Sequence, residues 1–356
     1  MAYFYKLPAI TELTIGQQAA LNEPRAIAIS GGPGTGKSVV SLWRHIRNYG
    51  TGSKKSLLLT YTKTLETFLA SSAKSEAEKE KNEITKKRML ESPENVDRTY
   101  WWTIHHVKNY DEIIVDEAQD VEAEIYNTIK KYSGVVSYGA DDQQIVFRNR
   151  ATTQQQLAAI FPNNRSYVLD ENFRNSYEIM HFVRALFPNK IVPQSTLNNL
   201  LQEGRRGNKP ILLVSNNNAA KQTKAIIDII NQFKSATHNI AVLVPLQNHV
   251  TTFTNLIRNA GIQCSSFSTD DGSLGEINNI HVTTFKSSKG TEFDTVIIPD
   301  FENMIINIAQ LNVIEENDYY VAITRAKRNL YLVSTSTPNF LERSEQQKLT
   351  YSKEIL

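Results

Sequence analysis

The sequence predicts an α/β protein of two lobes, each built on a parallel sheet with crossover helices. Short runs rich in aliphatic and β-branched residues alternate with helix-like stretches along the 356-residue chain. Such alternation is typical of parallel sheets, because parallel strands need a crossover connection that is usually a helix. The first strand leads into a glycine-rich octapeptide, and a chain of this length has room for two domains with separate cores.

Two sets of strands are expected, separated by a polar stretch that contains several prolines and glycines. The first set comprises residues 26–30, 56–60, 112–115, 135–138 and 167–169. The second set comprises residues 211–214, 240–244, 280–284, 295–298 and 330–333. Breaker-rich polar segments often mark domain boundaries. We therefore expect one lobe over residues 1–187, a linker over 188–208 and a second lobe over 209–356.

The composition is that of an ordinary globular protein. Charged residues make up 21% of the chain, apolar residues 40%, and the net charge is +2, which neither demands nor excludes a nucleic-acid partner. No apolar run is long enough to cross a membrane, and no secretory signal is apparent. The single cysteine, Cys264, excludes an internal disulfide and suits a reducing compartment. We expect a cytoplasmic protein that is monomeric and has no membrane contact.

One charged segment, residues 74–90, is dense in helix formers and lies in a reduced insertion at about 71–98 of the first lobe. Its glutamates come early and its cations, Lys86, Lys87 and Arg88, come late, which suits the helix dipole. Two interpretations remain open. The segment could be a solvated helix, or a small element that contacts a nucleic-acid backbone through the late cations.

The octapeptide GGPGTGKS, residues 31–38, follows a strand and precedes a helix-like stretch at 39–49. It fits the phosphate-loop pattern G-x-x-x-x-G-K-[ST]. The glycines let backbone N–H groups point at phosphate, the lysine offers a charge to the β- and γ-phosphates, and the serine offers a hydroxyl to Mg²⁺. The sequence therefore predicts a nucleoside triphosphate site at Gly31, Gly34, Thr35, Gly36, Lys37 and Ser38.

A second signature, DEAQD, follows the apolar run 113–115. Asp116 is expected at the carboxyl end of a strand, where α/β proteins bind ligands, and would hold Mg²⁺ together with Ser38. Glu117 beside it can act as the general base on an attacking water.

GGPGTGKS followed by VDEAQD resembles superfamily 1 DNA helicases of the UvrD, Rep and PcrA kind. Further segments resemble the motifs of that family in the same order, over about residues 11–335. These segments are 11–17, 58–63, 103–105, 141–147, 169–174, 284–293 and 320–327.

The resemblance implies two RecA-like lobes with ATP and Mg²⁺ bound in the cleft between them. Its implied catalytic residues are Lys37, Asp116, Glu117, Gln144, Arg174 and Arg325. Gln17 matches the residue that reads adenine, while Gly290 and Glu292 match residues near the ribose. The implied contacts to a single strand, DNA rather than RNA, are Thr60, Tyr61, Thr103, His105, Phe147, Thr284 and Lys286.

Several positions depart from the family pattern. Asn149 stands where a base-stacking tryptophan is expected, and Lys286 stands at the usual histidine position. Tyr61 and Phe147 could stack on bases or belong to the core, and the pair Trp101-Trp102 could pack the core or line a nucleic-acid groove. Helicases of this family carry two insertions, called 1B in the first lobe and 2B in the second lobe. This chain lacks room for most of 1B and for 2B.

Two functions are consistent with these features. The favoured one is an ATP-dependent single-strand translocase or helicase, stimulated by single-stranded DNA and acting with a partner such as a nuclease. The alternative is an ATP-driven switch or sensor module that regulates a partner protein. The complete set of motifs favours the enzyme, because a pure binding module would not need all the catalytic groups.

Overall fold

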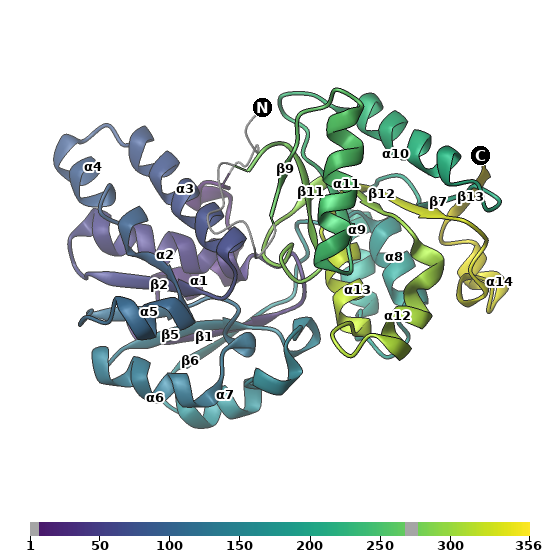
Figure 1. Ribbon diagram of the computed structural model, residues 1–356. Helices are drawn as coiled ribbons and strands as arrows, with labels where there is room; N and C mark the ends of the chain where they lie inside the picture. Colours follow the sequence, from purple (N-terminus) through teal and green to yellow (C-terminus); the bar gives the residue numbers. More distant parts are fainter. Residues whose placement is uncertain (1–6, 268–276) are drawn as a thin grey trace. The chain divides into compact units, whose positions relative to one another are not determined.

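The computed structural model describes residues 7–267 and 277–356, which divide after Phe173 into two compact units (Figure 1). We call the unit that ends at Phe173 the first lobe and the unit that begins at Arg174 the second lobe. No helix in these described ranges is both long and apolar enough to cross a membrane.

The first lobe contains a six-stranded sheet whose recorded pairings are all parallel, in the order β3-β2-β4-β5-β1-β6. The expected parallel sheet is thereby confirmed. The edge strand β3 was not expected, since three residues are too few to show a period. The strands are β1 (Ile27–Gly31), β2 (Ser56–Thr60), β3 (Val96–Arg98), β4 (Glu112–Val115), β5 (Val136–Ala140) and β6 (Arg165–Leu169).

Helices cover both faces of this sheet (Figure 1). On one face, Trp102, Tyr126 and Leu157 of α5, α6 and α7 pack against the apolar strand residues. The other face carries α2 and α3. The helices are α1 (Ile15–Asn22), α2 (Lys37–Thr51), α3 (Lys63–Lys79), α4 (Glu83–Met89), α5 (Thr99–His105), α6 (Ala123–Tyr132) and α7 (Gln154–Ile160).

The charged segment 74–90 is divided between two helices rather than forming one. Asn82 caps the second of them, α4, by accepting hydrogen bonds from the N–H groups of Ile84 at 3.1 Å and Thr85 at 3.0 Å. Such a cap starts a new helix and so interrupts the old one. The segment is also only partly solvated. Met89 is buried, and the guanidinium of Arg88 lies against Gly52 after the end of α2, where an added Cβ would be 3.0 Å from Nη1 of Arg88.

The second lobe contains a seven-stranded sheet with parallel pairings throughout, in the order β13-β7-β12-β11-β8-β10-β9. Five of its strands were expected. The short strands β9 and β13 lie at its edges, have exposed or half-exposed residues, and lack an apolar run. The strands are β7 (Ile211–Val214), β8 (Ile240–Val244), β9 (Ser265–Ser266), β10 (Ile280–Thr284), β11 (Phe293–Ile298), β12 (Ala326–Ser334) and β13 (Ser352–Ile355).

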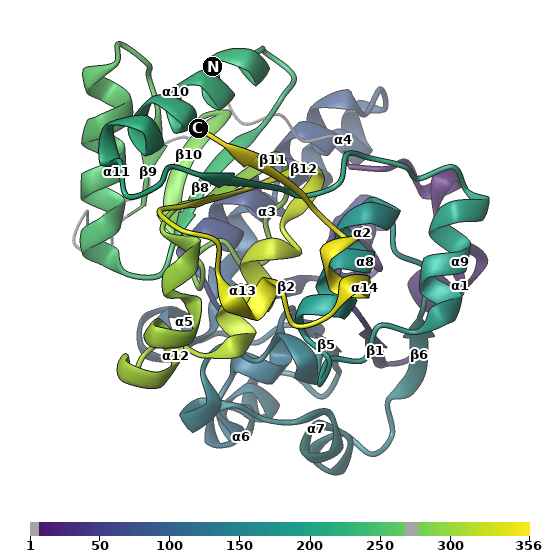
Figure 2. The ribbon, with the colours of Figure 1, turned by 90° about the vertical axis from the view of Figure 1, so that its right-hand side faces the viewer.

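Alternate residues of the second sheet face different helices, as strand geometry requires. Leu212 and Val214 of β7 belong to a core shared with α8 and α13, whereas Leu213 belongs to a core shared with α10 and α11. Figure 2 shows these helices on the two sides of the sheet. The helices are α8 (Tyr177–Leu186), α9 (Gln194–Gln202), α10 (Ala219–Phe233), α11 (Gln247–Asn259), α12 (Met304–Gln310), α13 (Glu316–Ile323) and α14 (Glu345–Lys348).

The division of the chain lies earlier than the sequence suggested. The prediction placed residues up to 187 in the first lobe and treated 188–208 as a linker. In the structure α8 packs in the core of the second lobe, and the stretch 188–208 contains α9, whose Leu197 and Leu200 are buried in the same core. The polar composition of that stretch reflects the exposed face of a short helix. The side chain of Asn175 anchors this start of the lobe by donating to the carbonyls of Thr324 at 3.0 Å and Ala326 at 2.6 Å.

Candidate nucleotide-binding site

The phosphate loop joins β1 to α2 and requires glycine at two positions. A Cβ at Gly31 would lie 2.3 Å from the carbonyl oxygen of Leu169, too close for any other residue. Gly36, the N-cap of α2, has φ of 87°, and a Cβ there would lie 2.4 Å from Nε2 of Gln17. The N–H groups of the first turn of α2 therefore begin at the loop, which is the arrangement that binds phosphate. The loop is also tied to the end of the first lobe, since the N–H of Phe173 donates to the carbonyl of Gly34 at 2.8 Å.

Gln17 lies against this loop. Its Nε2 donates to the carbonyl of Thr35 at 2.9 Å, and its Oε1 accepts from the N–H of Thr14 at 3.0 Å in a capping box at the start of α1. Gln17 thus braces the loop, a contact that the sequence did not reveal. Its contact with adenine stays a prediction.

Lys37 and Asp116 meet beside β5. Both side chains are buried, and a Cβ at Gly139 would lie 3.5 Å from Oδ1 of Asp116 and 3.6 Å from Cβ of Lys37. The Nζ of Lys37 donates to the carbonyl oxygens of Gly31 at 2.7 Å and Gly32 at 3.0 Å. The lysine of the loop and the carboxylate that follows β4 are therefore brought together as expected for one site.

Glu117 holds a left-handed backbone conformation, with φ of 56° and ψ of 43°. A residue other than glycine loses about 1–2 kcal/mol in this region, and such strain is concentrated at functional sites. The side chain is buried and its Oε2 accepts from Nε2 of Gln119 at 2.7 Å. The strained turn and this hydrogen bond together fix the carboxylate of Glu117.

Asp141, which the sequence did not single out for a role, connects two of the predicted residues. Its Oδ2 accepts from Nε2 of Gln144 at 2.6 Å and lies 3.9 Å from Nζ of Lys37. Its own N–H donates to Oε1 of Gln119 at 3.1 Å. Gln144, one of the catalytic residues implied by the resemblance, is therefore linked to the loop lysine by a buried carboxylate at the carboxyl end of β5.

Ser38 and Asp116 offer a hydroxyl and a carboxylate, the hard oxygen ligands that Mg²⁺ prefers. Across residues 7–267 and 277–356, three or more His, Cys, Asp or Glu side chains are nowhere grouped as metal ligands. The two residues still fit Mg²⁺, because this ion usually takes one or two protein ligands and fills its shell with phosphate oxygens and water.

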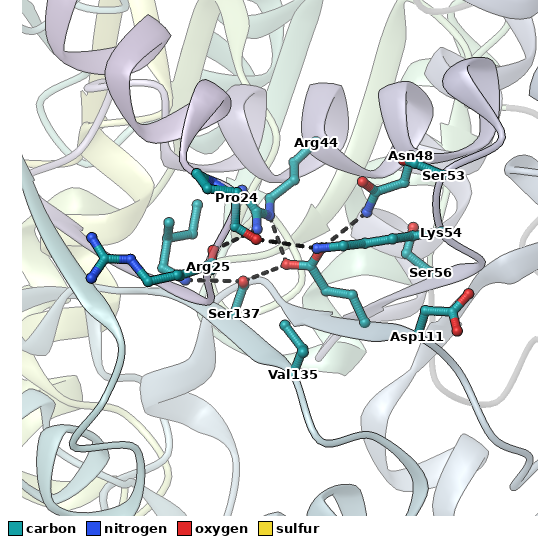
Figure 3. Close-up of polar contacts among 12 residues, drawn as sticks. Pro24, Arg25, Arg44, Asn48, Ser53, Lys54, Ser56, Asp111, Val135 and Ser137 are labelled. Atoms are coloured by element: carbon teal, nitrogen blue, oxygen red, sulfur yellow. Dashed lines mark hydrogen bonds and ion pairs between the residues drawn. The ribbon is translucent and has the colours of Figure 1, made fainter.

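A buried ionic network supports the site from the opposite end of β4. Glu112, the first residue of β4, accepts from Nε of Arg44 at 2.6 Å and from Oγ of Ser137 at 2.6 Å. Asn48 and Lys54 also donate to this carboxylate, at 3.0 Å and 3.3 Å (Figure 3). Burial acts to raise the pKa of Glu112, but Arg44, Ser137 and Lys54 outweigh it and hold the pKa below its ordinary value. The network fixes α2, which begins at Lys37, to the strand that leads to Asp116.

In the second lobe, the predicted residues Arg174 and Glu292 are paired, with Nε and Oε2 3.1 Å apart. Lys327 lies 3.4 Å from the same carboxylate. Burial alone would raise the pKa of Glu292, but the cations of Arg174 and Lys327 lower it below its usual range. Arg174 is therefore held next to the residue that the resemblance assigned to the ribose.

Arg325 is buried and connects two segments of the second lobe, the end of α13 and the turn that contains Thr291. Its Nε donates to the carbonyl of Val321 at 3.0 Å and its Nη1 to the carbonyl of Thr291 at 3.2 Å. Gly290, just before Thr291, has φ of 80°, which favours glycine. The arginine thus joins the segment 284–293 to the end of α13, which lies in the segment 320–327.

The candidate nucleic-acid residues of the first lobe differ in accessibility. The rings of Tyr61 and Phe147 are half-buried and contact each other, with centroids 4.7 Å apart. Thr60 is fully buried, and its carbonyl accepts from Oγ1 of Thr99 at 3.0 Å. Thr103 is half-buried, whereas His105 is exposed.

In the second lobe, Thr284 closes a turn through its hydroxyl, which lies 3.0 Å from Oγ of Ser287. Lys286 forms an ion pair with the buried carboxylate of Asp318, at 3.4 Å. Burial raises the pKa of Asp318 to about 6, although Lys286 opposes this shift. The lysine at the usual histidine position therefore has a carboxylate partner that the sequence did not indicate.

A phosphate loop, an acidic strand end and a strained glutamate on a parallel sheet define the first lobe as a P-loop nucleotide-binding lobe, and the second lobe has a parallel sheet of its own. Residues 24–226 match the family described as Schlafen group 3, DNA/RNA helicase domain, and residues 265–337 match the UvrD-like helicase C-terminal domain. The first match covers more than half of the chain, so the chain belongs to this helicase-domain family. The second match relates its C-terminal part to the UvrD-like helicases of superfamily 1.

Two curated proteins and one solved structure are similar to parts of the chain. A protein of Acanthamoeba polyphaga mimivirus, named provisionally as an ATP-dependent DNA helicase, is 26% identical over 243 residues, which are 62% of this chain and 34% of that protein. The RecB subunit of the RecBCD enzyme of Chlamydia pneumoniae is 39% identical over 69 residues, 19% of this chain and 6% of RecB. The chain thus spans about a third of the first relative and less of the second. The structure of the PRRSV helicase is 13% identical, with a TM-score of 0.42, over 93% of this chain and 55% of that one.

Proposed function

We propose that this chain is an ATP-dependent translocase or helicase that acts on single strands, with ATP hydrolysis stimulated by single-stranded DNA. The observation that carries the proposal is the convergence of Lys37, Asp116 and the Asp141–Gln144 pair beside the phosphate loop of a helicase-family lobe. DNA is favoured over RNA because the mimivirus relative is named as a DNA helicase.

The residues of the first lobe take complementary roles in this proposal. Lys37 exchanges its carbonyl partners for the β- and γ-phosphates, and Glu117 accepts a proton from the attacking water. Gln144 positions the same water or the γ-phosphate through its amide. Mg²⁺, held by Ser38 and Asp116, would neutralise charge on the phosphate oxygens.

The arginines of the second lobe are proposed to act on the transition state. Arg174 and Arg325 are each held by acceptors of their own lobe, Glu292 and the carbonyl of Thr291. Guanidinium groups fixed in this way can stabilise charge that develops on a transferring phosphoryl group.

We further propose that the strand is contacted by Tyr61, Phe147, Thr103 and His105 of the first lobe and by Thr284 and Lys286 of the second. Because Thr60 is buried, its contribution would come through the position of Tyr61. A partner protein, such as a nuclease, remains part of the proposal, and RecB is itself named as a subunit of a larger enzyme.

ATPase assays with and without single-stranded DNA and RNA test the function. We expect stimulation by DNA in the parent chain and weak nucleotide binding by Lys37→Ala. Nucleotide binding without stimulation by either strand would instead support the ATP-driven switch.

A second experiment tests the role of Arg325. Arg325→Ala should lower the hydrolysis rate with little change in nucleotide affinity, because the interaction is made mainly in the transition state. Circular dichroism serves as the folding control, since Arg325 also joins two turns of its lobe. Normal hydrolysis by a folded variant would remove Arg325 from the site.

A further inference from the structure

Helix α5 presents a large apolar and aromatic surface to solvent. Tyr100 is 64% exposed, Trp101 42% and Ile104 53%, whereas Trp102 is buried in the core of the first lobe. The two adjacent tryptophans therefore differ: Trp102 holds the helix on the sheet, and Trp101 faces outward. The helix follows the edge strand β3 and is labelled in Figure 1.

The exposed ring of Trp101 is held in place by its neighbours. The ring centroids of Trp101 and His105 are 4.1 Å apart, with planes inclined by 42°. Cζ of Arg98 lies 5.3 Å from the centroid of the Trp101 ring, a cation–π contact. An exposed ring held by such contacts loses little freedom when a flat partner stacks on it.

The surroundings of Trp101 favour an anionic partner. The stretch 103–110 contains His105, His106 and Lys108 and no carboxylate, and residues 104–109 are all exposed. Two carboxylates lie nearby on other segments: Glu66 is 3.2 Å from Nε of Arg98, and Asp97 is 2.7 Å from Nδ1 of His106. These carboxylates pair with Arg98 and His106, and Asp111 follows the stretch, so the basic character of the α5 surface comes mainly from the exposed Lys108. Aromatic rings beside a cation are a combination that binds single strands.

We propose that Trp101, assisted by Tyr100 and His105, stacks on the bases of single-stranded nucleic acid. The inference rests on the proposed function and names the stacking residue of that strand site. Asn149 is exposed and stands where the family pattern has a base-stacking tryptophan. Stacking by Trp101 would replace the contact that Asn149 cannot make. The stacking surface is thereby supplied by a different element of the same lobe.

The test uses the full chain, the oligonucleotide dT20 and an abasic oligonucleotide with the same number of phosphates. Trp43 and Trp102 are buried, so quenching of the tryptophan fluorescence on adding dT20 reports mainly on Trp101. We expect quenching by dT20 in the parent and none in Trp101→Leu. Affinity for dT20 should fall about tenfold in that variant, as removal of one base–aromatic stack predicts.

Two variants serve as controls. Trp101→Phe should retain most of the affinity, because phenylalanine can still stack. Ile306→Ala, which removes a 52% exposed apolar side chain from α12, should bind dT20 like the parent. The abasic oligonucleotide should bind the parent and Trp101→Leu equally, since it offers phosphates without bases.

The outcomes separate this inference from the proposed function. If the parent binds dT20 but Trp101→Leu binds it with unchanged affinity, the inference is overturned and the α5 surface is left for a protein partner. Equal weakening toward the abasic oligonucleotide would also overturn it, because the effect would then concern phosphates. If the parent binds neither DNA nor RNA single strands, the proposed function itself fails.

Discussion

At the scale of single residues, Glu117 combines a proposed chemical role with a strained backbone, and the two can be separated. Glu117→Gln should bind ATP but lose about 10²-fold or more in hydrolysis, because the general base is lost. Glu117→Gly should be equally inactive. It should also be about 0.5–1 kcal/mol more stable than Glu117→Gln, since glycine adopts φ of 56° without the left-handed penalty.

Steady-state hydrolysis, nucleotide titration and chemical denaturation of the two variants measure these effects. Parental turnover by Glu117→Gln would exclude the base role. A Glu117→Gly chain less stable than Glu117→Gln would show that contacts of the longer side chain outweigh the backbone strain.

Asp318 gives a residue-level prediction about pH. Burial raises its pKa from the ordinary 3.8 to about 6, so between these values the folded state binds more protons than the unfolded state. The contribution of Asp318 to stability is therefore highest below pH 4 and falls as the pH rises to 6. Asp318→Asn has no carboxylate to ionise at this position. The free energy of unfolding of this variant, relative to that of the parent, should therefore rise by on the order of 2 kcal/mol between pH 4 and pH 6, given about 1.4 kcal/mol per pKa unit.

Denaturation of both chains from pH 4 to pH 7 measures this difference. A difference that does not vary with pH would mean that Lys286 keeps Asp318 ionised throughout.

The sequence offered candidate site residues but not the contacts that those residues make in the structure. Lys37, Asp116 and Gln144 follow from motif spacing, which depends on local chain geometry. The contacts of Gln17 with Thr35, and of Lys286 with Asp318, join segments that are distant in sequence, so no local pattern records them. Asp141 lies in the segment 141–147, directly after an expected strand. That position, where α/β proteins bind ligands, could have identified Asp141 as a site residue.

At the scale of elements, long apolar strands were predicted and short edge strands were not. The ranges 56–60, 112–115 and 240–244 coincide with β2, β4 and β8, because buried parallel strands are continuous apolar runs. In contrast, α9 was interpreted as a linker, since only a narrow face of that helix is apolar. Its burial depends on α8, a tertiary contact that composition does not show.

The network around Glu112 predicts a large effect on stability from a residue far from the chemistry. Glu112→Gln leaves the buried guanidinium of Arg44 without its anionic partner, and breaking a buried pair costs about 3–5 kcal/mol. Because the pKa of Glu112 is lowered in the fold, its contribution is present above the ordinary value of 4.5 and is lost as the pH falls below it.

Urea denaturation at pH 7 and at pH 4 measures this contribution, and the difference between variant and parent should be smaller at pH 4. Glu124→Gln on the exposed side of α6 is the matched control and should change stability by less than about 0.5 kcal/mol. A small effect of Glu112→Gln at pH 7 would mean that solvent reaches the network and compensates for the lost charge.

At the scale of the whole molecule, the residues that the structure describes are taken up mainly by the two sheets and the helices that cover them. Between Arg174 and Thr284, the described residues are occupied by α8, α9, β7, α10, β8, α11, β9 and β10. Opening a base-pair step costs about 1–2 kcal/mol. A chain with little 1B or 2B insertion, and with Asn149 in place of a stacking tryptophan, has few groups to hold the nucleic acid against that cost. We therefore expect this chain alone to show strand-stimulated ATPase activity but little processive unwinding. Its binding to the strand should weaken strongly as salt increases.

A strand-displacement assay on a long tailed duplex measures unwinding by the purified chain. Addition of a partner that grips duplex should increase the product. Displacement of hundreds of base pairs by the chain alone would contradict this expectation.

The hydrogen bond from the N–H of Phe173 to the carbonyl of Gly34 offers a way to detect phosphate at the proposed nucleotide site. Phe173 is the last residue of the first lobe, and the next residue is Arg174. A phosphate that moves the loop backbone would also move the carbonyl of Gly34, which accepts the hydrogen bond from Phe173. The rate of hydrogen–deuterium exchange at the Phe173 amide should therefore report whether phosphate is bound at the loop, without requiring ATP hydrolysis.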